Sequence, residues 1–131
     1  MSQQTPAPAP LGLLLSDDLI FSSRITATAR ALGLIIKTAR STSLLVTMAQ
    51  KEMPRCVIVD LAHPSLALHD LLLQLQRISS PGPLVVAYGS HVDAAGLRAA
   101  REAGCDLVLP RSKFVAELPK ELPAWFEVSR E

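Results

Sequence analysis

Two short apolar runs in this sequence end close to acidic residues, and they constrain the fold more than any other feature. Residues 11–15 lead into Asp17 and Asp18, and residues 56–59 lead directly into Asp60. A continuous apolar run that stops at polar residues is typical of a strand buried on both faces of a parallel sheet. Ligands of open α/β sheets lie at the carboxyl ends of such strands. Three carboxylates there repel one another unless a proton or cation offsets their charge, which predicts a site for an oxygen-preferring ion, above all Mg²⁺.

Length and composition bound the class of protein. A chain of 131 residues with 49% hydrophobic residues is expected to form one globular domain with a single core. Aromatic residues make up only 4%, so we expect aliphatic layers to fill that core. The net charge of +1, with scattered basic residues, gives no field for nucleic acid. No apolar stretch reaches membrane-spanning length and no secretory signal is apparent, so we expect a cytoplasmic protein without a membrane or nucleic-acid partner.

The two ends and the cysteines give further expectations. Residues 1–10 are polar and rich in proline, which favours an extended or disordered arm, and residues 11–131 are expected to form the domain. Cys56 and Cys105 lack the spacing of metal ligands and flank apolar runs. We therefore expect two reduced, buried thiols.

Strand and helix signals alternate along the chain. We expect strands at residues 11–16, 34–36, 56–59, 84–87 and 107–109. We expect helices at residues 19–32, from a cap at 41–43 to Pro54, from a cap at Ser65 to residue 78, at 93–103, and after Ser112, where Pro119 should kink or truncate the helix. This alternation with short connections predicts a doubly wound, flavodoxin-like α/β fold with five parallel strands in the order 2-1-3-4-5.

These motifs together resemble the receiver domain of bacterial two-component response regulators, over roughly residues 11–122. The resemblance rests on the acid pair after the first expected strand and on Asp60 with Pro64 four residues later. It also rests on Ala103-Gly104 before the fifth expected strand. None of these motifs is specific alone, but their order and spacing match the family.

The resemblance implies a phosphoryl-acceptor site. It implies that Asp60 accepts the phosphoryl group and that Asp17, Asp18, Asp60 and the backbone carbonyl of Ala62 bind Mg²⁺. The chemistry suits these residues, because a carboxylate can act as a phosphoryl nucleophile and a metal neutralises crowded oxygens. The resemblance also implies a protein partner, either a sensor kinase or an output protein.

Other family positions are changed in this sequence. The hydroxyl residue of the fourth strand is replaced by Gly89, with Ser90 one position later, and the lysine of the fifth strand is replaced by Arg111. Arginine keeps the charge and can bind an anion through its fork, but it is not a compact ammonium. We take these three residues as candidate phosphate contacts. Because Val108 also replaces the family's aromatic switch residue, the chain is expected to be an atypical receiver.

Two further pairs of residues leave alternatives open. His63 and His91 follow the third and fourth expected strands, where they could join the acids in binding Zn²⁺ or Mn²⁺, or could be solvated loop histidines. Trp125 and Phe126 lie in an atypical C-terminal tail. They either pack back onto the domain or form an exposed surface for a partner, and we take them as partner-surface candidates.

The favoured interpretation is a stand-alone, atypical receiver-like signalling module, not an enzyme, that acts through protein–protein contact. Weak Mg²⁺-dependent phosphorylation of Asp60 would control it. One alternative is a pseudo-receiver for docking or homodimerisation, in which Arg111 pairs with Asp60 or Asp17 and no phosphate is accepted. Another is a small metal-dependent enzyme. A site of oxygen ligands beside a free Asp60 would favour the phosphorylated signalling module. An ion pair between Arg111 and Asp60 would favour the pseudo-receiver, and metal binding by His63 or His91 would favour the enzyme.

Overall fold

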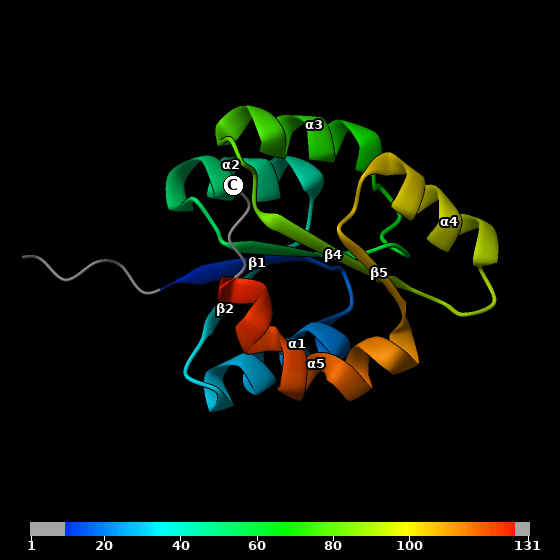
Figure 1. Ribbon diagram of the computed structural model, residues 1–131, viewed down its shortest axis with the longest axis horizontal. Helices are drawn as coiled ribbons and strands as arrows, with labels where there is room; N and C mark the ends of the chain where they lie inside the picture. The colour runs from blue at the N-terminus through cyan, green and yellow to red at the C-terminus, as the bar shows by residue number, and fades with distance from the viewer. Residues whose placement is uncertain (1–9, 128–131) are drawn as a thin grey trace, which may run out of the picture.

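The computed structural model describes residues 10–127, which contain one sheet of five parallel strands (Figure 1). The strands are β1 (Leu11–Leu15), β2 (Ile35–Ala39), β3 (Cys56–Asp60), β4 (Leu84–Gly89) and β5 (Leu107–Pro110). Their order is β2-β1-β3-β4-β5, so the predicted doubly wound, flavodoxin-like fold is confirmed. The predicted arm, residues 1–10, lies outside the described residues apart from Pro10. No helix in the described range is long and apolar enough to cross a membrane.

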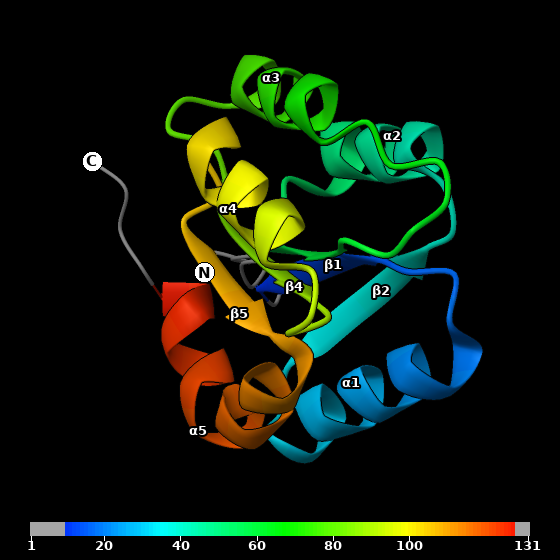
Figure 2. The same ribbon diagram turned by 90° about the vertical axis from the view of Figure 1, so that its right-hand side faces the viewer.

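Five helices cover the two faces of this sheet. They are α1 (Leu19–Ala31), α2 (Thr42–Glu52), α3 (Leu68–Ile78), α4 (Ala94–Ala103) and α5 (Arg111–Glu127). Helices α2, α3 and α4 lie on one face, and α1 and α5 lie on the other (Figures 1 and 2). Because every crossover returns the chain to the same starting edge, the loops that follow the strands gather at the opposite, carboxyl edge.

The core differs between the two faces. On the side of α2, α3 and α4 the large buried side chains are aliphatic, as expected. On the side of α1 and α5 the core contains all of the chain's aromatic residues, three phenylalanines, one tyrosine and one tryptophan. The rings of Tyr88 and Phe114 stack with centroids 4.6 Å apart, and those of Phe114 and Trp125 lie 5.9 Å apart. The expectation of a wholly aliphatic core is therefore wrong for this face.

Helix α5 continues through both of its prolines to Glu127, so the expected truncation at Pro119 is wrong. A proline inside a helix costs about 3 kcal/mol. Burial of one large apolar side chain stabilises the fold by about 1.5–3 kcal/mol. Several such side chains occur at helical spacing on the inner face of α5, so burial outweighs the proline penalty. They are Phe114, Leu118, Leu122, Trp125 and Phe126.

The partner-surface hypothesis for Trp125 and Phe126 is also wrong. Only 5% of Trp125 and 2% of Phe126 is exposed. The ring of Phe126 lies directly on β1 at Gly12, where an added Cβ atom would come within 2.8 Å of the phenylalanine Cζ atom. The end of α5 is therefore part of the core, and Gly12 provides the space for it.

Side-chain caps begin three of the helices. Asp18, Ser41 and Asp93 each accept a hydrogen bond from a backbone N–H in the first turn of α1, α2 and α4. The expected cap at Ser65 is wrong, because α3 begins at Leu68 and its preceding residue is Ala67, which has no capping side chain. The amphipathic stripe of leucines on α3 packs on the sheet and holds this helix without a cap.

Both cysteines are free and buried, which confirms the expectation for them. Burial raises the pKa of the Cys56 thiol to about 12 and that of Cys105 to about 11, with a smaller contribution from the negative charge of Asp106. Both side chains therefore stay protonated near neutral pH and behave as small apolar core groups.

The contact between Gly12 and Phe126 gives a direct test of this packing. Gly12→Ala should lower the free energy of unfolding by about 1–3 kcal/mol, because the added methyl group overlaps the Phe126 ring. Adding Phe126→Leu to this variant should recover part of the loss. Gly82→Ala is the control, because the nearest atom to its added Cβ lies 3.6 Å away. Urea denaturation measures all four proteins, and equal stability of the two alanine variants would contradict the packing.

Candidate functional site

Asp60 is the last residue of β3 and is buried, with 3% of its surface exposed. Its Oδ1 atom accepts a hydrogen bond of 2.9 Å from the backbone N–H of Ala62. The backbone N–H of His63 donates to the Asp60 carbonyl at 3.1 Å, which fixes the turn after the strand. The strand and this turn together hold the carboxylate at the carboxyl edge of the sheet.

The acid pair after β1 divides into two roles. Asp18 is half-buried and caps α1, because its Oδ1 atom accepts from the Phe21 N–H at 2.9 Å. Asp17 is exposed and lies 3.4 Å from the guanidinium of Arg40. An exposed pair of this kind contributes little to stability, so Asp17 can exchange this partner for another cation.

One cavity of about 220 Å³ brings the predicted metal ligands together. It is lined by Asp17, Asp18, Asp60, Ala62, His63, Pro64 and Arg111. Within residues 10–127, no group of three or more His, Cys, Asp or Glu side chains is arranged so that it could hold a metal ion. Magnesium commonly keeps several waters and needs only one or two protein carboxylates, so the oxygen donors of this cavity fit the ion in kind.

Arg111 is the first residue of α5, and an aromatic ring holds its side chain. The central carbon of the guanidinium lies 4.6 Å from the centroid of the Phe21 ring and 5.8 Å from that of Tyr88. In the described part of the chain Arg111 forms no ion pair with Asp60 or Asp17. The ion pair that the pseudo-receiver hypothesis requires, between Arg111 and Asp60 or Asp17, is therefore not formed. Arg111 instead lines the acidic cavity as a cation without a carboxylate partner.

The other two candidate phosphate contacts do not line the cavity of Asp60. Gly89 is buried at the end of β4, and an added Cβ atom would meet Leu61 Cδ1 at 3.3 Å and Leu97 Cδ2 at 3.4 Å. A hydroxyl-bearing side chain at this position would therefore start against apolar neighbours. Ser90 is exposed, and its Oγ atom accepts from the Val92 N–H at 3.3 Å, beside a neighbouring hollow.

The two histidines differ from each other. His63 is buried, and its Nδ1 atom accepts a hydrogen bond from the Ser65 N–H at 3.2 Å. Because Nδ1 is an acceptor, the proton of the neutral ring is on Nε2, which donates to the Arg40 carbonyl at 2.6 Å. With both nitrogens engaged, His63 is neither the solvated loop histidine nor the metal ligand that we considered. His91 is exposed and lines the neighbouring hollow, away from the acidic cavity.

Tyr88 is a site residue that the sequence did not reveal. It is paired in register with Asp60 across β3 and β4, and its ring packs between Phe21 and Phe114. Its buried hydroxyl lies near Asp60 and Ser16 but makes no well-formed hydrogen bond. Burial, and then the negative charge of Asp60, raise the pKa of Tyr88 above its ordinary value. The expected strand ended at residue 87, one position too early to show this pairing.

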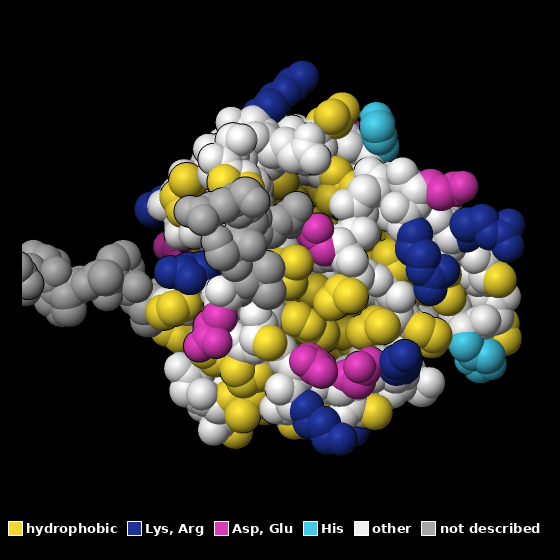
Figure 3. Space-filling model, in the orientation of Figure 1, with side chains coloured by type: hydrophobic (Ala, Val, Ile, Leu, Met, Phe, Trp, Pro, Cys, Tyr) yellow, Lys and Arg dark blue, Asp and Glu magenta, His cyan; other side chains and the backbone are white. Residues whose placement is uncertain are grey.

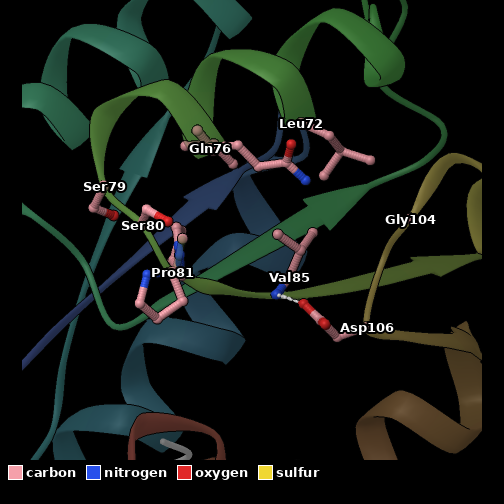
Figure 4. A pocket seen from close by; sticks show the side chains of 11 residues that line it. Leu72, Gln76, Ser79, Ser80, Pro81, Val85, Gly104 and Asp106 are labelled. Atoms are coloured by element: carbon pink, nitrogen blue, oxygen red, sulfur yellow. Dashed lines mark hydrogen bonds between the residues drawn. The ribbon is translucent and has the colours of Figure 1, made fainter. Parts of the chain in front are cut away.

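A separate cavity lies at the opposite edge of the sheet (Figure 4). It has a volume of about 280 Å³ and is bounded by the end of α3, the loop to β4, Gly104 and Asp106. There Asp106 accepts a hydrogen bond of 2.8 Å from the Val85 N–H, joining the starts of β4 and β5. None of the residues predicted for the acidic site lines this cavity.

The link between Asp60 and Tyr88 can be measured because Tyr88 is the only tyrosine in the chain. The ultraviolet absorbance of tyrosinate should appear at higher pH in the folded protein than in unfolded protein. Asp60→Asn should lower this pKa by removing a nearby negative charge, whereas Asp17→Asn should leave it unchanged. Because the unfolded state loses this proton first, stability should fall as pH rises above the unfolded pKa. Equal titration of all three proteins would contradict the contact.

Comparisons with known proteins identify the fold of this chain. No family model and no curated protein matches the chain. Among solved structures, it is similar to the receiver domain of a Pseudomonas aeruginosa sensor histidine kinase, described with magnesium coordinated in the active-site cleft. The two are 18% identical, with a TM-score of 0.77 over 92% of this chain and 100% of that chain.

Two further structures give the same result. The receiver domain of Francisella response regulator 1452 is 17% identical, with a TM-score of 0.73 over 90% of this chain and 97% of its own. A CheY-like receiver domain protein from Methanospirillum hungatei is 13% identical, with a TM-score of 0.76 over 92% and 95%. The resemblance predicted from the sequence is therefore confirmed at the level of structure, and this chain has the receiver fold.

Proposed function

We propose that this chain is a cytoplasmic signalling module of the receiver type, not an enzyme, and that it acts through protein–protein contact. Phosphorylation of Asp60 in the presence of Mg²⁺ controls it. The observation that carries this proposal is the position of Asp60, buried at the end of β3 in one cavity with Asp17, Asp18, Ala62 and Arg111. This places one protected carboxylate among oxygen donors and a cation that has no carboxylate partner.

In this proposal Asp60 is the nucleophile. Its Oδ1 atom is held by the Ala62 N–H, which leaves the other carboxylate oxygen to form the new bond to phosphorus while the donor's leaving group departs. Asp17, Asp18, Asp60 and the Ala62 carbonyl are the residues that would hold Mg²⁺. When bound, this ion would offset the negative charge of the carboxylates and the phosphoryl oxygens.

Arg111 takes the role of anion clamp in this proposal. Its stacking on Phe21 leaves the guanidinium N–H groups available, and a guanidinium binds phosphate oxygens through two parallel hydrogen bonds. Gly89 brings no hydroxyl, and Ser90 lies at a neighbouring hollow. Because one oriented donor is missing where charge develops, we expect phosphoryl transfer to be slow. This is the basis for calling the module atypical.

Exposed apolar surface supports contact with a protein. Leu19, Ile20 and Val92 follow β1 and β4 at the carboxyl edge and are 64%, 86% and 78% exposed. On the face shown in Figure 3, hydrophobic side chains also gather between α4 and α5, over the edge strand β5, where Leu107 is exposed. The first surface suits a kinase that must reach Asp60, and the second suits an output protein or a second copy of the chain.

A phosphorylation-independent docking module is the second candidate. It is favoured by Asp17, which already pairs with Arg40, and by the missing hydroxyl at Gly89. The metal-dependent enzyme loses its support, because both ring nitrogens of His63 are engaged and His91 lies outside the acidic cavity.

The first experiment tests phosphorylation. The full chain is incubated with acetyl phosphate and Mg²⁺ and followed by intact mass spectrometry. We expect slow, incomplete addition of one phosphoryl group, abolished by Asp60→Asn because the nucleophile is removed. Lys113→Gln is the control, since Lys113 lines neither the acidic cavity nor the hollow beside it. Absence of labelling would favour the docking module, and rapid, complete labelling of Asp60 would contradict the atypical assignment.

A second experiment tests the ion. Ligand that binds only the folded state stabilises it, by about 1.4 kcal/mol at tenfold excess over the dissociation constant. Mg²⁺ should therefore raise the melting temperature, and Asp17→Asn should remove most of this response. Asp70→Asn on α3 is the matched control, because that carboxylate is exposed and, among residues 10–127, hydrogen-bonds only Gln74. A melting curve unchanged by millimolar Mg²⁺ would contradict the proposed metal site.

A further inference from the structure

A larger hollow lies directly beside the acidic cavity. It has a volume of about 650 Å³ and is formed by the start of α1, the β4–α4 loop and the start of α5. Pockets that hold small organic ligands have volumes of about 300–1,000 Å³. The residues that line it are Phe21, Arg24, Ala62, Ser90, His91, Arg111, Ser112 and Val115.

The polar lining of this hollow carries one sign of charge. Arg24 and Arg111 contribute two guanidinium groups, and His91 adds an imidazole. None of the described lining residues is acidic, and within residues 10–127 neither arginine forms an ion pair. The hydroxyls of Ser90 and Ser112 add hydrogen-bond donors. Cationic groups without carboxylate partners, together with hydroxyls, favour an anion.

The hollow also has an apolar wall. Phe21 and Val115 are only partly buried, so each keeps some apolar surface for an occupant. Phe21 is fixed from two sides, because its ring lies 5.0 Å from that of Tyr88 and the Arg111 guanidinium stacks 4.6 Å from its centroid. A ring and a guanidinium held in this way need little rearrangement to meet a ligand, which lowers the entropy cost of binding.

We propose that this hollow binds a small organic anion, one ring system that carries a carboxylate, sulfonate or phosphate group. Arg24 and Arg111 bind the anionic group, and Phe21 and Val115 pack against the ring. The proposal does not depend on phosphorylation of Asp60. Arg111 lines both this hollow and the acidic cavity, so the bound anion lies beside the carboxylate site and shares a cation with it.

The test uses naphthalene-1-sulfonate as a ring-bearing anion and inorganic phosphate as an anion without a ring. Each is titrated into the full chain while backbone amide shifts are recorded by NMR. We expect naphthalene-1-sulfonate to shift the amides of Phe21, Ser90 and Ser112. Phosphate should bind at least tenfold more weakly, because it gains no apolar contact.

Variants assign the anion to its arginines. Arg24→Gln and Arg111→Gln should each weaken naphthalene-1-sulfonate binding at least fivefold, since each removes a charge-assisted hydrogen bond. Arg111→Lys should weaken it less than Arg111→Gln, because the charge remains. Arg30→Gln is the matched control, an exposed arginine in the last turn of α1 that does not line the hollow.

Three results would overturn the proposal. One is a set of shifts at the cavity of Figure 4 or spread over the surface, which would indicate unspecific binding. The second is equal affinity of the Arg24→Gln and Arg30→Gln proteins, with both amide spectra showing intact folds. The third is equal affinity for phosphate and naphthalene-1-sulfonate, which would reduce the hollow to a simple anion site.

Discussion

Four aromatic rings in contact on one face of the sheet tie the last helix to the strand that borders Asp60. Phe21 comes from α1, Tyr88 from β4, and Phe114 and Trp125 from α5, with neighbouring ring centroids 4.6–6.3 Å apart. Such pairs each add about 0.5–1.5 kcal/mol to the burial of the rings. The same stack places the Arg111 guanidinium over Phe21, so the packing of the core also sets the position of the cation in the candidate site.

The strands and their order in the sheet could be predicted because local hydrophobic pattern and chain topology determine them. Strands buried on both faces are continuous apolar runs, and β1 and β3 appear in the sequence as such runs. Right-handed crossovers then leave few possible arrangements, which is why the position of Asp17, Asp18 and Asp60 at one edge followed from the sequence.

The errors share a different origin, because they concern residues whose environment is made by distant parts of the chain. Pro119 was expected to interrupt the helix because proline does so locally. The buried side chains on the inner face of α5 stabilise the helix in spite of it. Trp125 was kept as a partner-surface candidate beside the alternative of packing back, because nothing in the sequence shows its contact with Phe114. His63 looked like a loop histidine, and its bond to the Arg40 carbonyl joins positions far apart in the chain. Tertiary contacts override local propensity in each case.

The packing of the Phe126 ring on Gly12 has a consequence for folding during synthesis. Gly12 in β1 is synthesised more than a hundred residues before the ring that covers it, which belongs to the last turn of α5. Arg55, just before β3, also reaches the Phe126 carbonyl at 3.4 Å. A nascent chain that has not yet reached Phe126 therefore leaves this part of β1, an interior strand of the sheet, uncovered, and the packing on that face is complete only after α5 has been made.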